Sequence, residues 1–144
     1  MIVVRGCAFP PELHYHVEHN VWLREDGGIV TLGATSFGVA LAGEFVSFRP
    51  KPAGTAIAAD GSVGLIELWK TLVSVRTPVA GALIEGNARV TTDPGAINED
   101  PYGSGWLVRL KAPRWPAGSL VTGDAIAPAF EAAMALENFE GPPA

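Results

Sequence analysis

Glycine and proline interrupt this chain at short intervals and leave little room for long helices. Seventeen glycines and twelve prolines are spread over 144 residues, between runs rich in Val, Ile, Leu and Thr. Glycine and proline residues at short intervals between β-branched runs predict a mainly β fold of short strands. The expected strands are His14 to Trp22, Ile29 to Gly33, Glu44 to Phe48, Thr55 to Ala58, Ser62 to Trp69, Ser74 to Thr77, Gly81 to Glu85 and Gly105 to Leu110.

Two short segments carry helix signals. Thr35 to Leu41 begins with a residue that can cap a helix and is followed by Gly43. Asp93 to Asn98 begins with a capping Asp, and Pro94 suits the first helical position because its missing N–H would have no partner there. Both segments are expected to form short helices.

The longest helix is expected near the C-terminus. In "DAIAPAFEAAMALENF", Ile126, Phe130 and Met134 recur at a helical spacing, and Pro128 is tolerated because it falls in the first turn. This helix is expected to pack on the β body. Trp106, in the last expected strand, is predicted to be a core residue.

Length and charge limit the function classes. A chain of 144 residues suits one domain, here residues 1–144, with a core of about 13–111 and a C-terminal helical extension of about 112–144. The net charge is −5, and the three lysines are not clustered. Binding to nucleic-acid phosphates needs clustered cations, so no nucleic-acid partner is expected.

The lone cysteine and the absence of long apolar runs bear on location. Cys7 cannot form an internal disulfide and suits a reducing compartment, where it is expected to be a small buried residue. No stretch approaches the length of a membrane span. The sequence therefore predicts a cytoplasmic protein with no membrane partner.

A lysine stands in the most apolar part of the chain. In "GLIELWKTLVSVRTPVAGALIEG", Lys70 lies between two strand-like runs. A buried charged amine is costly, so a hairpin turn at Lys70 to Val73, with the amine exposed, is the expected arrangement. The turn "WKTLV" contains no Gly, Pro, Asn or Asp. Turn propensity therefore does not explain why the turn falls here.

Three motifs resemble those of one known family. The run from Glu67 to Lys70, followed by Thr77-Pro78-Val79-Ala80-Gly81, resembles the lipoyl-lysine hairpin of glycine cleavage H proteins. "NEDPYGSGW" is similar to a signature of that family, and "HYHVEHNVWLREDGGIVTLGAT" resembles its opening hairpin. The resemblance extends from Leu13 to Lys111.

The resemblance implies a fold and a function. The fold would be a barrel-sandwich hybrid of the lipoyl or biotinyl carrier type, with short helices and a C-terminal helix. Lys70 would be the lipoyl attachment site, and the chain would be a non-catalytic carrier with a swinging arm. Its partners would be a lipoate ligase or lipoyl transferase and the enzymes that the arm visits. Lysine is required because its amine can lose a proton and attack an activated acyl group.

Departures from the family pattern point to a particular branch. Trp69, Thr71 and Leu72 replace small residues around the lysine, and both terminal segments resemble lipoate-binding proteins of the heterodisulfide-reductase-like sulfur-oxidation system. That system, with its reductase-like complex as partner, is the favoured assignment. One alternative is an H protein that carries an aminomethyl group for the glycine cleavage enzymes. Another is an unlipoylated scaffold or regulatory homologue.

Other candidate residues carry less specific signals. Glu67 could steer the ligase or simply face water, and Trp69 could shield the arm or pack across strands. His14, His16 and His19 suggest a metal site, and His14 and His16 would share a strand face near Glu18. No Cys pair or distant His completes a zinc site, so no metal ligand is predicted. A biotin carrier is disfavoured because no methionine flanks Lys70. No catalytic residue is predicted, since no motif arranges a nucleophile with a base.

Overall fold

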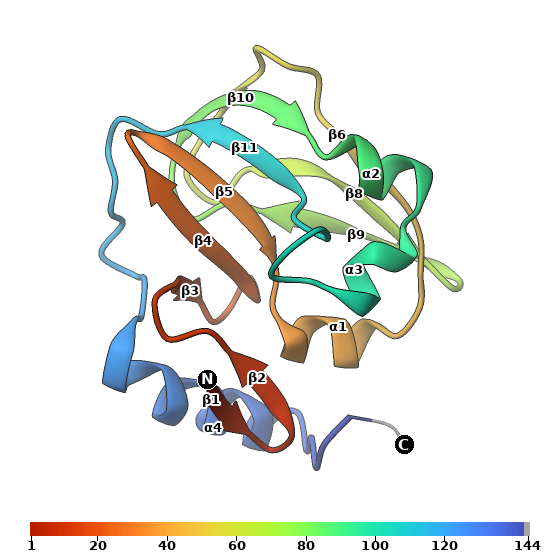
Figure 1. Cartoon of the computed structure of the whole chain (residues 1–144), viewed down its shortest axis with the longest axis vertical. Coiled ribbons are helices and arrows are strands. Elements are labelled where there is room, and N and C mark those ends of the chain that lie inside the picture. Colours follow the sequence, from red (N-terminus) through yellow and green to blue (C-terminus); the bar gives the residue numbers. More distant parts are fainter. Residues whose placement is uncertain (143–144) are drawn as a thin grey trace.

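The computed structural model describes residues 1–142 and arranges them as short strands with few helices (Figure 1). The strands are β1 (Ile2–Val4), β2 (Cys7–Phe9), β3 (His14–His16), β4 (Val21–Asp26), β5 (Ile29–Ala34), β6 (Phe45–Pro50), β7 (Ala56–Ile57), β8 (Ser62–Leu68), β9 (Thr71–Arg76), β10 (Gly81–Gly86) and β11 (Val108–Lys111). The helices are α1 (Ser36–Ala42), α2 (Ala88–Thr92), α3 (Gly95–Glu99), the 3₁₀ turn η1 (Gly123–Ala125) and α4 (Ile126–Leu136).

The strands form three antiparallel sheets. The largest has six strands in the order β3-β4-β5-β11-β10-β7, and a three-stranded sheet has the order β6-β8-β9. The third sheet is the N-terminal hairpin β1–β2. The predicted mainly β fold of short strands is therefore confirmed.

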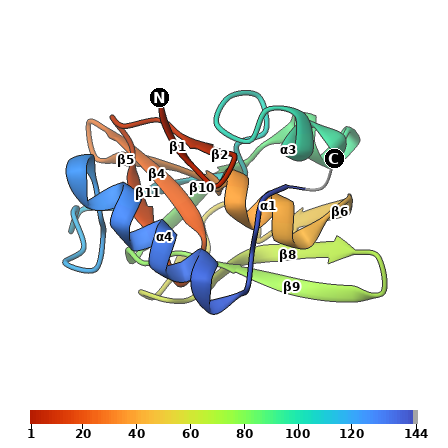
Figure 2. The ribbon, with the colours of Figure 1, turned by 90° about the horizontal axis from the view of Figure 1, so that it is seen from below.

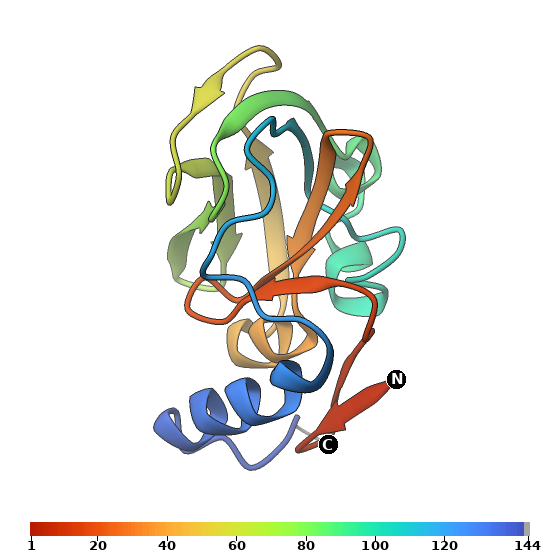
Figure 3. The same cartoon turned by 90° about the vertical axis from the view of Figure 1, so that its left-hand side faces the viewer.

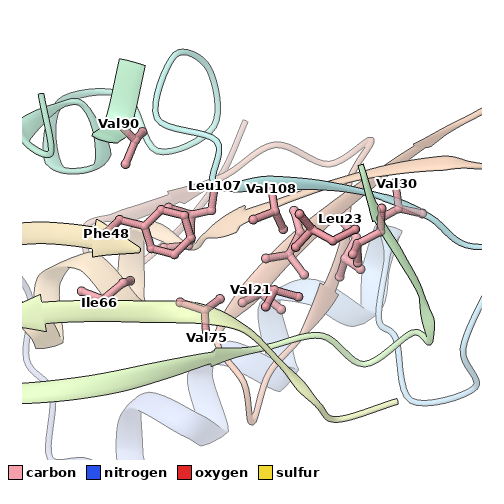
Figure 4. Close-up of a cluster of buried hydrophobic side chains, with 14 of the residues drawn as sticks. Val21, Leu23, Val30, Phe48, Ile66, Val75, Val90, Leu107 and Val108 are labelled. Atoms are coloured by element: carbon pink, nitrogen blue, oxygen red, sulfur yellow. The ribbon is translucent and has the colours of Figure 1, made fainter. Parts of the chain in front are cut away.

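The main core fills the space between the six-stranded and three-stranded sheets (Figure 4). Leu23 and Val108 come from the larger sheet, and Phe48, Ile66 and Val75 come from the smaller one. Each of these side chains is at most 6% exposed. Burial of one such side chain contributes roughly 1.5–3 kcal/mol, so this core holds the two sheets together.

A second core joins the two ends of the chain (Figure 3). The helix α4 buries Ile126, Phe130 and Met134 completely, as the helical spacing predicts. The ring of Phe130 stacks on Phe9 of β2, with centroids 4.2 Å apart. The C-terminal helix therefore packs against the N-terminal hairpin, which the strand prediction missed because β1 and β2 have only three residues each.

Some predicted boundaries are wrong. The segment His14 to Trp22 is two strands, because the chain reverses through a turn in which Asn20 takes a φ of 59°. β9 begins at Thr71 rather than Ser74, so the predicted turn of Lys70 to Val73 is too long. The last strand begins at Val108 rather than Gly105. Local propensity does not fix these ends, which depend on cross-strand pairing.

The short helices are confirmed with small shifts. The hydroxyl of Thr35 accepts a hydrogen bond from the N–H of Gly38 at 3.0 Å, as expected of the cap of α1. The helix predicted at Asp93 to Asn98 is α3, which begins at Gly95, and α2 precedes it without having been predicted. No helix within residues 1–142 is both long and apolar enough to cross a membrane.

Candidate functional site: the hairpin of Lys70 and its cavity

Lys70 lies at the tip of the β8–β9 hairpin. Leu68 pairs with Thr71, so Trp69 and Lys70 are the only residues of the loop. Lys70 has a φ of 70°, in the left-handed region that glycine and asparagine usually occupy in turns. The hairpin end projects beyond the rest of the three-stranded sheet (Figure 2). The expected hairpin tip is present, and it is tighter than predicted.

The lysine side chain is accessible. Lys70 is exposed, and within residues 1–142 no hydrogen bond or ion pair engages its amine. Its neighbours are apolar yet open to solvent: Trp69 is 78% exposed and Leu72 is 64% exposed. Trp69 therefore does not pack across the strands. The tip presents one exposed amine surrounded by apolar surface.

A mostly apolar cavity of about 260 Å³ lies along one face of this hairpin. Leu68 and Val73 contribute to its lining from the hairpin, and Leu41 and Ala42 do so from α1. His19 provides one of the few polar groups of the lining. A flexible apolar group attached at the tip has a compartment of matching chemistry beside it.

The opposite face of the hairpin carries a second pocket, of about 210 Å³. Ser47, Arg49, Leu65, Glu67 and Leu72 line it. The carboxylate of Glu67 accepts a hydrogen bond from the hydroxyl of Ser47 at 3.0 Å. Glu67 therefore faces away from the cavity, and the structure gives it a cross-strand partner within its own sheet.

A cluster of two histidines and one carboxylate lies at the edge of the cavity. Nε2 of His19 is 2.7 Å from Oδ1 of Asp60. The rings of His16 and His19 stack with centroids 4.0 Å apart. Burial lowers the pKa of His16, and the neighbouring His19 lowers it further. The hydrogen bond from His19 lowers the pKa of Asp60. The histidines were visible in the sequence, but Asp60 was not connected with them because it is distant from them along the chain.

Comparison with known proteins identifies the family. The profile of the glycine cleavage H-protein family matches residues 13–131. Glycine cleavage system H protein 5 of Aquifex aeolicus is 36% identical over 115 residues, which is 77% of this chain and 78% of that protein. The chain belongs to the glycine cleavage H-protein family. The family resemblance expected from the three motifs is therefore confirmed.

Two further proteins extend the H-protein comparison. A probable glycine cleavage system H protein 3 of Sulfurisphaera tokodaii is 32% identical over 135 residues, covering 94% of this chain and 93% of that protein. The crystal structure of an H protein from Mycobacterium marinum matches with a TM-score of 0.73 at 29% identity, covering 83% of this chain and 97% of that one. The barrel-sandwich fold predicted from the resemblance is confirmed.

The motif "NEDPYGSGW" of this H-protein relative has a structural role. The amide of Asn98 donates to the carbonyl of Gly43 at 2.7 Å and its oxygen accepts from the N–H of Phe45 at 3.3 Å. The hydroxyl of Tyr102 donates to the carbonyl of Ala8 at 2.7 Å. Trp22 donates its indole N–H to the motif at the carbonyl of Pro101. These hydrogen bonds connect the motif to the end of α1 and the start of β6, to β2 and to β4.

Two other residues singled out in the sequence have framework positions. Cys7 is 2% exposed, and burial raises the pKa of its thiol. Trp106 is only half buried and precedes β11, so its placement in a core strand is wrong. The guanidinium of Arg109 lies 4.0 Å from the centre of its ring. Trp106 therefore lies outside the main core and packs at the margin of the second core, with a charged side chain on its ring.

Proposed function

We propose that this chain is a lipoyl carrier and that Lys70 is the residue to which lipoate is attached. The observation that carries the proposal is the position of Lys70, exposed at the end of a two-residue hairpin loop within an H-protein fold. A lipoate ligase or lipoyl transferase must reach the amine without disturbing the sheet. The projecting tip allows this approach.

The hairpin also controls where an attached group can go. β8 pairs with β6 on one side and with β9 on the other, so the base of the loop is held by two strands. The short loop leaves the attachment point with little freedom of its own. Lipoate, once bound as an amide, supplies a strained cyclic disulfide that accepts electrons or exchanges with thiols. The chain itself positions that group and leaves the chemistry to partner enzymes.

The cavity beside the hairpin supports the same proposal. Its lining is largely apolar, and Leu68 and Val73 connect it directly to the strands that carry the tip. An apolar arm that folds back from Lys70 exchanges water for apolar contacts there, which is favourable. The cavity would shelter the end of the arm between visits to partner enzymes.

Intact mass of the protein from its native host tests the attachment. We expect a lipoyl adduct that peptide mapping places on Lys70. The adduct should be absent from Lys70→Ala and from Lys70→Arg, because arginine offers no amine of the required type. Lys51→Ala and Lys111→Ala are matched controls that should retain it. An unmodified Lys70 in cells that actively use lipoate would favour the unlipoylated scaffold instead.

A second, more specific proposal concerns the enzyme system in which the lipoyl arm works. The curated relatives named above are called glycine cleavage system H proteins, so the glycine cleavage enzymes are one set of candidate partners. The sulfur-oxidation assignment rests on the two terminal segments, which resemble that branch, and on the altered tip, where Trp69 and Leu72 add bulky apolar side chains. A partner built for a small-residue tip would meet steric conflict at Trp69, which is 78% exposed.

A reconstituted glycine–bicarbonate exchange assay distinguishes the two systems. The lipoylated protein would be compared with an authentic H protein at equal lipoyl content. We expect little exchange with this chain and restored exchange when Trp69 and Leu72 are both replaced by alanine. Comparable rates for the unaltered chain would overturn the sulfur-oxidation assignment while leaving the lipoyl carrier proposal intact.

A further inference from the structure

We propose that His16, His19 and Asp60 form a binding site for a divalent transition-metal ion of the zinc type, at the edge of the cavity. One ligand atom from each residue lies within 4.8 Å of the others. Two imidazoles and one carboxylate form a ligand set that zinc uses, with a fourth position left open. The site is independent of lipoate, since all three ligands belong to the folded chain.

Zinc binding would require only small movements of the three ligand atoms. Zinc holds nitrogen and oxygen ligands at about 2.0–2.2 Å, so the donors of one tetrahedral site lie roughly 3–4 Å apart. His19 and Asp60 are now joined directly at 2.7 Å, and an ion would separate them slightly. The ligand atom of His16 would move inward on the order of an ångström. Side-chain rotation supplies such movements without a change in the backbone.

The backbone holds the ligands on two fixed turns. His19 lies in the turn between β3 and β4, where the N–H of Asn20 donates to the carbonyl of His16 at 2.9 Å. Asp60 lies in a second turn with a φ of 65°. Its N–H donates to the carbonyl of Thr77 at 2.6 Å, and its carbonyl accepts from Arg76 at 3.0 Å. The two turns face each other before any ion binds, so little ordering is needed on binding.

The protonation states also suit a cation. Metal ligands must be deprotonated, and metal affinity falls when protons compete. The pKa of His16 is lowered by burial, which favours its neutral form, and the pKa of Asp60 is lowered by its hydrogen bond with His19. An ion bound between His19 and Asp60 would take the place of their direct hydrogen bond.

One existing hydrogen bond must be exchanged. Nδ1 of His16 accepts the backbone N–H of His19 at 3.0 Å. Ligation through Nδ1 replaces that bond with a metal bond, and ligation through Nε2 leaves the ring proton on Nδ1, which can then no longer accept the N–H. The net contribution of one neutral hydrogen bond to stability is modest. The apparent binding free energy of a structural zinc ion is several times larger.

Titration with Zn²⁺ against a chromogenic zinc indicator tests the site. The full chain is used without a histidine tag, and Co²⁺ absorption reports the coordination geometry. We expect one equivalent to bind, and both Asp60→Asn and His19→Ala to weaken binding at least about tenfold. Asp60→Asn should keep the fold, because Asp60 is 67% exposed and asparagine tolerates a positive φ. Melting curves of the metal-free proteins check this.

His14→Ala is the matched control. His14 is two residues from His16, but its ring packs edge-on against Trp115, with centroids 4.9 Å apart. This variant should bind Zn²⁺ as the unaltered chain does. The site is refuted by the absence of stoichiometric binding to the unaltered chain, by full binding to Asp60→Asn, or by an equal loss in His14→Ala.

Discussion

Leu68 and Thr71 pair directly across the end of the β8–β9 hairpin, and Lys70 between them is held at a φ of 70°. A side chain with a Cβ is disfavoured in this conformation by roughly 1–2 kcal/mol. Glycine or asparagine would fit the loop with less strain. Backbone preference therefore does not explain why a lysine stands at the tip. A requirement for its amine would explain it.

The first prediction separates stability from attachment at this position. Lys70→Gly should raise the free energy of unfolding by about 0.5–1 kcal/mol, because relief of the left-handed strain exceeds the entropy that glycine adds to the unfolded chain. Lys70→Ala should change it by less than about 0.5 kcal/mol, since the side chain is exposed. Both variants should lose the lipoyl adduct. Urea unfolding measures stability, and a marked loss in Lys70→Ala would contradict the exposed position.

The second prediction concerns the packing of Trp22 on Gly33. These residues face each other between β4 and β5, and a Cβ on Gly33 would lie 2.5 Å from the indole ring. Gly33→Ala should lower the free energy of unfolding by about 1–3 kcal/mol or more through overpacking. Gly118→Ala is the control, because a Cβ there meets nothing within 4 Å. Similar melting temperatures for both variants would show that the ring can move aside.

Some of the fold could be predicted from local patterns. The buried stripe of α4 and the cap of α1 follow from residue spacing, because helical periodicity is visible within one segment. The mainly β class follows from the glycine and proline spacing. The amine at the hairpin tip could also be predicted, since two apolar runs flank Lys70. These features depend on residues that are close in sequence.

Features that depend on distant contacts could not be predicted. Asp60 meets His19 only because the six-stranded and three-stranded sheets face each other. Trp106 has apolar sequence neighbours, yet Arg109 stacks on its ring and β11 begins after it. The early start of β9 reflects pairing of Thr71 with Leu68. Strand pairing and the packing of a charged side chain on a ring depend on other parts of the chain. The residue pattern within one strand therefore does not reveal them.

The third prediction compares two tryptophans. Trp22 is fully buried and donates its indole N–H to the carbonyl of Pro101 at 2.9 Å. Trp22→Ala should lower the free energy of unfolding by about 3–5 kcal/mol. Trp106→Ala should lower it by about 1–2 kcal/mol, since the side chain is half buried and its contact with Arg109 adds about 0.5–1 kcal/mol. Equal losses in denaturant unfolding would contradict the position of Trp106 at the margin of the second core.

The fourth prediction concerns the pH dependence that His16 introduces. Burial is the main cause that lowers the pKa of His16 in the folded protein below the ordinary value of 6.5. As pH falls below about 6.5, the unfolded chain binds a proton at this position before the folded chain does. Stability should therefore fall with acidification from about pH 6.5 until the pH reaches the folded-state pKa. Below that pKa both states are protonated and this contribution becomes constant.

The variant His16→Asn isolates this effect. Its side-chain oxygen can accept the N–H of His19 as Nδ1 does, but it does not titrate. Urea unfolding of both proteins with a chelator present should show a smaller loss of stability from pH 7.5 to 5.5 in the variant. Asp60 does not interfere in this range, because its lowered pKa gives stability that disappears only below its ordinary value of 3.8. An unchanged slope in His16→Asn would show that His16 is not the group whose protonation opposes folding.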